Sequence, residues 1–312
     1  NPITKSGETI SIGALNEITM FNSDTSCSHE HYNADGFCEA CGAYQEPKNW
    51  KGYYEIYNAG QLFWFAKQFN DSKIPDNSNL KLMKDIKIPS GRDWTSIGNI
   101  TDKFFKGTIE GNYHVISGLR PANDGTIFKW GLVAWIKHGS VQNIGLVLEG
   151  NWACGLCRNA YDSNIQNCFV VGTDFSNSCS YGTVTNCLAV SGKLEGTKYS
   201  NDHRATFTNC YETTKSGYSS PGITTLDNEE KLKKLKSGEI AYKLNDEKSD
   251  GTWGQVIGTE VYPHFRKYSK TVYYDQATDT YSNNQTASIS SATVTDIKTI
   301  SETKATATIK AT

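Results

Sequence analysis

The residues whose types and spacing are best suited to chemistry are cysteines and histidines near the N-terminus. They lie in the segments Cys27-Ser-His29-Glu-His31 and Cys38-Glu-Ala-Cys41-Gly42. A C-x-x-C pair places two thiolates on one tight turn, and the glycine that follows lets the turn close. A third cysteine and one histidine complete the Cys₃His set that is typical of structural zinc. We therefore predict a zinc site at Cys27, His29, Cys38 and Cys41, with His31 as the alternative ligand.

This site is expected to stabilise structure and not to catalyse a reaction. Four protein ligands leave no open coordination position for a water molecule. The segment has about twenty residues and is too short to bury a core of its own, so a staple is expected. The same residues leave a second interpretation open, in which one disulfide forms here and one thiol stays free.

A short phrase that recurs four times dominates the middle of the chain. It reads Val141-Gln-Asn143-Ile144, Ile165-Gln-Asn167-Cys168, Val184-Thr-Asn186-Cys187 and Phe207-Thr-Asn209-Cys210. The steps from one asparagine to the next are 24, 19 and 23 residues, counted from positions 143, 167, 186 and 209. A period of this length indicates a solenoid.

The alternation of side chains breaks at each asparagine. Residues two apart in a strand share a face, yet Ile165 and Asn167 have one parity and Cys168 and Val170 the other. Asparagine tolerates left-handed backbone angles, so the break indicates a bend. Stacked turns would form an amide ladder and an interior cysteine column, made by Asn143, Asn167, Asn186 and Asn209 and by Cys168, Cys187 and Cys210. We predict an all-β chain with a short right-handed parallel β-helix; chance repetition in a β-sandwich is the alternative.

The remaining segments suggest how this solenoid begins and ends. A helix capped by Asn58, with Gln61 three residues on, is expected to cover its first turn. Two short helices broken at Ser237-Gly238 are expected to follow it. The expected order is a linker or end of a preceding module (1–26), the Cys/His knuckle (27–49), a helical cap and β-helix (50–216), C-terminal capping helices and a closing segment (217–275), and a Thr/Ser-rich linker with the start of a further β-sandwich (276–312).

Charge and composition narrow the possible partners. The net charge of −2 gives no electrostatic footprint for nucleic acid or for an anionic membrane. No apolar run approaches the roughly 20 residues that span a bilayer, so no membrane insertion is expected. The chain begins at Asn1 and is expected to be part of a larger multidomain protein, with its targeting signals outside this fragment.

Two further groups of residues have chemical alternatives. Trp130, Trp135 and Trp152 would stack on sugar rings if exposed, or fill wide coils if buried. Cys154 and Cys157 have C-x-x-C spacing but lack the strand-to-helix context of a redox motif, so they are expected to be buried thiols or disulfide partners, together with Cys179.

Enzymatic activity is not expected. Polysaccharide-cleaving β-helices need clustered carboxylates or a basic residue on one exposed face. The charged residues of the coils do not recur at a shared position; they are Arg158, Asp162, Asp174, Lys193 and Glu195.

Three phrases, taken in order, resemble the β-helical repeat modules of large bacterial surface proteins. They are Tyr54-Glu-Ile-Tyr-Asn58-Ala-Gly-Gln-Leu62-Phe-Trp64-Phe-Ala66, Trp94-Thr-Ser-Ile97-Gly98, and Gly131-Leu-Val133 followed by Gly139-Ser-Val141-Gln-Asn143-Ile144-Gly145-Leu146. The last resembles the GLUG repeat of adhesin-like proteins. The resemblance covers about residues 50–270, and Cys154, Cys157 and Cys179 depart from it where small residues are usual.

The resemblance implies a secreted or cell-surface bacterial module that spaces or presents binding regions, with a host glycan or protein as its partner. It supplies no catalytic residues. The alternative function is a carbohydrate-binding or polysaccharide-cleaving β-helix module, which a row of exposed aromatics with two or more carboxylates on one face would favour.

Overall fold

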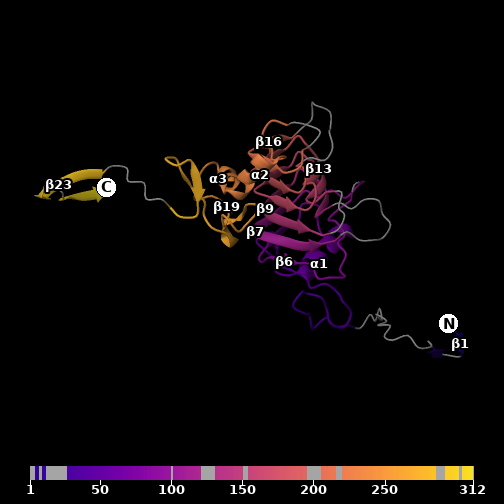
Figure 1. The fold of residues 1–312 in the computed structure, drawn as a ribbon. Coiled ribbons are helices and arrows are strands. Elements are labelled where there is room, and N and C mark those ends of the chain that lie inside the picture. Colours follow the sequence, from indigo (N-terminus) through magenta and orange to yellow (C-terminus); the bar gives the residue numbers. More distant parts are fainter. Residues whose placement is uncertain are drawn as a thin grey trace.

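The chain is built predominantly of strands with few helices, as the sequence predicts. Figure 1 shows the strands layered in a stack, with helices at its side and near its N-terminal end. The computed structural model describes residues 4–6, 9–11, 27–99, 101–120, 131–149, 154–194, 205–215, 220–285, 292–301 and 304–311.

The N-terminal part ends in a helix that begins where the sequence predicts. β1 (Thr4–Ser6) pairs with β2 (Thr9–Ser11), and β3 (Lys48–Trp50) pairs with β4 (Tyr53–Ile56), both antiparallel. The side chain of Asn58 caps α1 (Ala59–Asn70) by accepting the N–H of Gln61 at 2.9 Å. Leu62, Phe65 and Phe69 are fully buried on the face of α1 that packs on the first strands.

Parallel strands then pair in three sets along the stack. The first set runs through β8 (Val133–Lys137), β10 (Cys157–Tyr161) and β13 (Ser176–Ser180). The second joins β9 (Ser140–Leu148) to β11 (Asn164–Gln166), β14 (Thr183–Thr185) and β16 (Thr206–Thr208). The third links β4, β5 (Asn79–Leu82), β7 (Thr108–Leu119), β9, β12 (Phe169–Val171), β15 (Leu188–Val190), β17 (Cys210–Glu212) and β18 (Ile223–Thr225).

The core of the stack consists of apolar residues that occupy equivalent positions in successive layers. Neighbouring strands lie about 4.8 Å apart, so residues in register form columns. One column is Leu80, Ile109, Val141, Ile165, Val184 and Phe207, and all of its members are buried. The regular register explains why the same residue types return in each repeat.

The segment from Leu80 to Ile88, which reads as one alternating strand, is divided in the structure. β5 ends at Leu82, and β6 (Ile86–Lys87) starts after a turn and pairs with a later part of β7. The chain is therefore interrupted here, because β5 is in register with Ile109 and β6 with Ile116 of the same partner strand.

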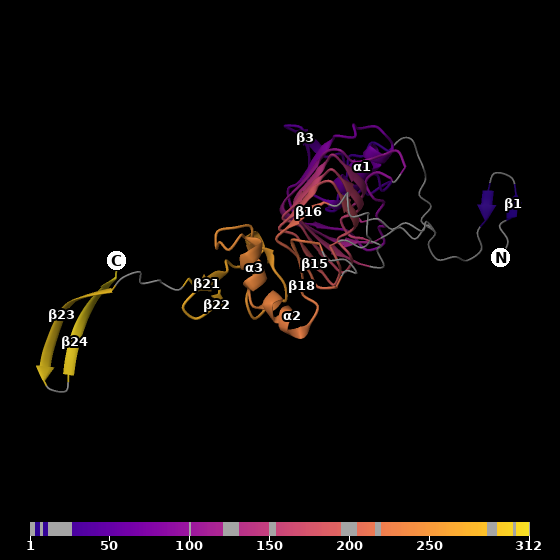
Figure 2. The ribbon, with the colours of Figure 1, turned by 90° about the horizontal axis from the view of Figure 1, so that it is seen from above.

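The C-terminal segment covers the outer face of the third strand set. Gly238, with φ of 92°, separates α2 (Glu229–Lys236) from α3 (Glu239–Leu244), as predicted. β19 (Trp253–Gly254) pairs with β20 (His264–Phe265), and the 3₁₀ turn η2 spans Arg266–Tyr268. Trp253 and Phe265 pack on Phe169, with ring centroids 6.1 and 5.2 Å away. Figure 2 shows both helices beside the stack.

Two strands lie at the boundary between the predicted closing segment (217–275) and the predicted Thr/Ser-rich linker. β21 (Tyr273–Asp275) and β22 (Thr280–Ser282) form an antiparallel hairpin, and its rings stack on Tyr242 of α3. The apolar contacts come from tyrosines, which the Thr- and Ser-rich composition conceals. β23 (Ala292–Ser301) pairs with β24 (Lys304–Ala311), and each pairs with no other strand of the described residues.

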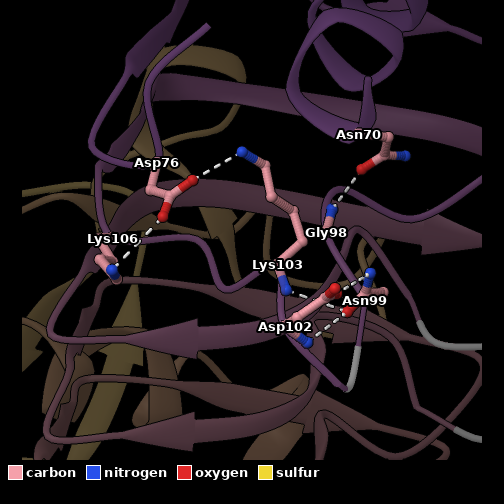
Figure 3. A network of polar contacts seen from close by, with 7 residues as sticks. All are labelled: Asn70, Asp76, Gly98, Asn99, Asp102, Lys103 and Lys106. Atoms are coloured by element: carbon pink, nitrogen blue, oxygen red, sulfur yellow. Dashed lines mark hydrogen bonds and ion pairs between the residues drawn. The ribbon is translucent and has the colours of Figure 1, made fainter. Parts of the chain in front are cut away.

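A network of polar contacts links α1 to the loop that contains Gly98 and Lys103 (Figure 3). Asn70 accepts the N–H of Gly98 at 2.7 Å, and Asn99 accepts the N–H groups of Asp102 and Lys103. The ammonium of Lys103 lies 2.7 Å from a carboxylate oxygen of Asp76. This hydrogen bond lowers the pKa of Asp76 below its usual range.

Candidate metal centre

The Cys/His knuckle, residues 27–49, contains short-range backbone hydrogen bonds around its cysteines. The N–H of Cys38 donates to the carbonyl of Ala43 at 2.8 Å, and the N–H of Gly42 donates to the carbonyl of Cys38 at 2.7 Å. Gly42 has φ of 73°, which favours glycine and lets the turn around Cys38 and Cys41 close. The sequence thus forms a turn that points two thiols in the same direction.

Four side chains converge at this turn: Cys27, His29, Cys38 and Cys41. Their ligand atoms all lie within 4.8 Å of one another. Sγ of Cys27 is 3.5 Å from Sγ of Cys38, and Sγ of Cys41 is 3.3 Å from Nδ1 of His29. Tetrahedral zinc with Zn–S bonds of about 2.3 Å separates its sulfur ligands by about 3.8 Å. The donor set and its spacing therefore fit a tetrahedral metal ion.

The two histidines of the knuckle differ in position. His29 belongs to the convergent group, in a left-handed conformation with φ of 53° that turns its ring toward the thiols. His31 is exposed, and its carbonyl accepts the N–H of Glu39 at 3.0 Å. Of the two candidate ligands, His29 is the one whose ring lies near the cysteines.

The thiols of the knuckle differ in acidity. A hydrogen bond with the side chain of His29, helped by the N–H of Cys41, lowers the pKa of Cys38 to about 6. The N–H of His29 lowers the pKa of Cys27, but hydrogen bonds shared with Cys41 and Cys38 outweigh it, so that the pKa of Cys27 is raised. The thiolate is the form that binds metal, and Cys38 is ready to supply it at neutral pH.

The knuckle docks on α1 through aromatic side chains. Phe37 is buried, and its ring centroid lies 5.7 Å from that of Phe63 and 5.8 Å from that of Tyr44. Gly60 of α1 donates its N–H to the carbonyl of Asp35 at 2.7 Å. A metal ion here would consequently stabilise a contact with the first helix of the stack.

The four repeated asparagines all stand at bends. Their φ angles are 56°, 50°, 52° and 51° for Asn143, Asn167, Asn186 and Asn209. The amide of Asn167 donates to Oδ1 of Asn143 at 3.0 Å, and that of Asn209 donates to Oδ1 of Asn186 at 2.8 Å. At the N-terminal end of this column, the amide of Asn143 donates to the carboxylate of Glu110.

The cysteines that follow these asparagines form a buried column. Each thiol donates to the carbonyl two residues earlier, at 3.1 to 3.3 Å, from Cys168, Cys187 and Cys210. Burial raises the pKa of Cys187 well above its usual range. The thiol of Cys187 is therefore protonated, and all three side chains are buried packing groups.

The second C-x-x-C pair is also buried. Cys154, Cys157 and Cys179 are free thiols, and burial raises the pKa of Cys154 to about 12. The hydroxyl of Ser176 lies 3.1 Å from Sγ of Cys179. Of the two expectations for these cysteines, the structure contains the thiols and not the disulfide.

The structure describes only some of the aromatic and charged candidates of the repeats. Trp130, Trp152 and Glu195 lie outside the described residues, and Trp135 is half-buried against Phe104 at 5.0 Å. Tyr161 and Tyr181 are 37% and 47% exposed and 5.2 Å apart. Asp162 pairs with His138 at 3.0 Å, while Asp174 accepts the N–H of Lys193. The carboxylates of Asp162 and Asp174 thus have local partners.

Sequence reasoning missed three arrangements whose members are far apart in the chain. They are the Glu110 carboxylate beside the asparagine column, the cluster of Asp85, His114, Lys267 and Tyr268, and the cleft around Arg92. His114 is joined to Lys267 across 153 residues. No local spacing of residues predicts this contact, although a single histidine within a largely apolar strand is a weak indication of a functional or buried polar contact.

The comparisons with known proteins add no name to this site. No family model matches the chain, and neither the curated proteins nor the solved structures yield a match. Among the described residues, none of the helices has the length and apolar character needed to cross a membrane.

Proposed function

We propose that the stacked strands form a short right-handed parallel β-helix, and that the chain is a non-catalytic structural or adhesin module of a bacterial surface protein. The observation that carries this proposal is the asparagine column, in which one bend geometry returns at each repeat. Parallel strands joined through such bends favour a coil, and right-handed crossovers are the rule for parallel strands. A stiff stack of this kind spaces or presents binding regions.

A structural zinc ion in the knuckle is the second part of the proposal. Cys27, His29, Cys38 and Cys41 would hold it, and four protein ligands would complete its tetrahedral coordination. Zinc would supply the cross-link that a segment of this size needs to remain folded. His29 and Cys38 already share a hydrogen bond that favours the thiolate, so the chain itself prepares the site.

Location at the cell surface follows from the resemblance to GLUG-type repeats and from the high content of polar turns. The partner would then be a host glycan or a host protein. Catalysis is not part of the proposal, because Asp162 and Asp174 are engaged by His138 and by the backbone of Lys193. A nucleic-acid partner is not proposed either, given the net charge of −2.

Labelling of intact cells tests the surface role. Antibodies raised against the purified chain should stain unpermeabilised cells of the source organism, with an antibody against a cytosolic protein as the negative control. Staining that appears only after permeabilisation would contradict the proposal. Incubating the purified chain with plant and host polysaccharides should release no new reducing or unsaturated ends, and their release would favour an enzyme.

A further inference from the structure

A cleft of about 460 Å³ lies between the knuckle and α1. Its volume falls in the range of about 300–1,000 Å³ that is usual for small-molecule sites. His29 and Cys41 form part of one wall, and α1 contributes Trp64 and Lys67. The cleft therefore joins the candidate metal centre to the first helix of the stack.

Arg92 is the most informative residue of this cleft. Its guanidinium lies 4.2 Å from the ring centroid of Phe37, and a Cβ on Gly42 would come within 3.7 Å of it. No ion pair of Arg92 occurs within the described ranges, although its side chain is half-buried. Its planar face is thus occupied by Phe37, while its N–H groups remain available for a planar anion such as a carboxylate.

The other walls of the cleft are aromatic and held in place. Tyr44 packs on Phe63, with ring centroids 5.4 Å apart, and Trp64 packs on Tyr54 at 5.7 Å. Tyr32 and Ala43 complete the knuckle side. Aromatic faces that are fixed before binding suit a compact ligand with C–H faces, because little conformational freedom is then lost.

The charges that line the cleft favour an anion. Arg92 and Lys67 are cationic, whereas Glu46 is the carboxylate residue among the lining side chains. Lys67 forms an ion pair with Asp71 at 3.0 Å and is largely exposed. Arg92 would therefore provide most of the electrostatic attraction for an anion. A ligand with one anionic group that binds Arg92 and a ring that packs on Trp64 would fit both the charge and the aromatic walls of the cleft.

We propose that this cleft binds a sugar that carries a carboxylate, with Arg92 holding the carboxylate and Trp64 packing on the sugar ring. The proposal deepens the proposed function by naming a class of glycan that the module would bind, and its knuckle wall rests on the proposed zinc site. Arg92 pairs with the carboxylate through its N–H fork, and the ring displaces water from the aromatic walls. The knuckle supplies one wall, so zinc removal should weaken binding by loosening this wall.

Calorimetric titration of the zinc-supplemented chain with glucuronate and with N-acetylneuraminate tests the proposal, with glucose as the neutral probe. At least one acid should bind, and glucose should bind at least 10-fold more weakly. Arg92→Ala should weaken binding about 10- to 100-fold, as expected when a hydrogen-bonded ion pair is removed. Arg92→Lys should retain part of the affinity, and Glu46→Gln should raise it.

Matched measurements separate binding from folding. Arg266→Ala removes an exposed arginine that lies outside the cleft and should leave the affinity unchanged. Thermal unfolding and zinc content are measured for each variant. Unchanged affinity in Arg92→Ala, equal binding of glucose, or no binding of either acid at 10 mM would overturn the proposal. The proposal would also be overturned if Arg92→Ala lost zinc but bound the sugars as before, because Arg92 would then be a charge partner of the thiolates. Binding of an Asp/Glu-rich peptide, with no binding of either sugar, would likewise overturn it.

Discussion

The ammonium of Lys267 lies 2.8 Å from Nε2 of His114, a contact that joins the C-terminal segment to β7 across the outer face of the stack. An ammonium can only donate, so Nε2 accepts and His114 is neutral in this arrangement. Its Nδ1 faces Asp85 at 3.0 Å and the hydroxyl of Tyr268 at 2.6 Å. Protonation of His114 would bring two cations together at this junction.

Acidification is expected to weaken the junction. Burial lowers the pKa of His114; the hydrogen bond that its ring donates to Asp85 opposes this lowering, and the charge of Lys267 adds to it. Because the folded pKa lies below the unfolded value of 6.5, the stability that neutral His114 contributes is complete above about pH 6.5 and is lost as the pH falls below it. The urea midpoint should therefore be lower at pH 5 than at pH 7.5.

Substitution separates His114 from the other histidines. His114→Asn should reduce the difference between the two midpoints. Burial also lowers the pKa of His264, so part of the difference should persist. The same pH dependence in His114→Asn as in the unmodified chain would show that Lys267 and His114 are not coupled.

Metal content provides the next prediction. Purified protein should contain about one zinc per chain, and Cys38→Ser or Cys41→Ser should abolish it, because three ligands hold zinc far more weakly than four. His29→Ala should act in the same way, while His31→Ala should retain the metal. Elemental analysis gives the zinc content, and a thiol titration in denaturant distinguishes zinc from disulfides: zinc predicts all nine cysteines as free thiols.

The pH at which zinc is released is also expected to follow the thiol chemistry. Metal binding requires thiolates, so acidification releases the ion. The pKa of Cys38 is about 6 in the folded chain, and zinc affinity should fall steeply below that pH. A chelator competition at pH 5.5 and 7.5 measures the change, and equal affinity at both values would argue against thiolate ligands.

The asparagine column gives a stability prediction. Asn167→Ala removes the hydrogen bond to Asn143 and places alanine at φ of 50°, so it should destabilise the chain by about 1–3 kcal/mol. Asn167→Gly removes the same bond but tolerates the angle, and should cost less. Gln166→Ala, at the exposed neighbouring position, serves as the control. Equal losses for alanine and glycine would mean that the bend contributes nothing.

Glu212 offers a test because it follows Leu146, Val170 and Ala189 in the same column, one layer before Thr225. It is 1% exposed, and it accepts the N–H of Leu194 at 3.0 Å and the hydroxyl of Thr225 at 2.9 Å. Glu212→Leu matches the apolar character of the column but leaves that N–H without its acceptor, which should cost about 1–3 kcal/mol. Glu212→Gln keeps an acceptor and should cost less, as chemical denaturation would show.

Local sequence rules account for much of the stack, because its determinants are short-range. The cap at Asn58, the break at Gly238 and the left-handed asparagines each depend on a residue's own backbone preferences. The knuckle is also local, since its four ligand residues lie between positions 27 and 41. Periodicity then links these pieces, because the same apolar positions return in each repeat.

Features built from distant segments could not be predicted in this way. The junction of Lys267 with His114 and the place of Arg92 over Phe37 depend on how whole segments pack. The hairpin of β21 and β22 was missed because its tyrosines gain their partner, Tyr242, only in the folded chain. The composition of a segment indicates its average polarity, but it does not indicate which of its few apolar side chains make contacts in the folded chain.

The unequal steps between the asparagines have a consequence for how such a chain can change. The stretch between β14 and β16 contains more residues than that between β11 and β14, yet both pairs keep the same parallel alignment. Additional residues are therefore accommodated between strands without altering the layers. The number of residues between two layers can thus differ while the parallel pairing on either side is kept, so length variation between strands need not disturb the register of the stack.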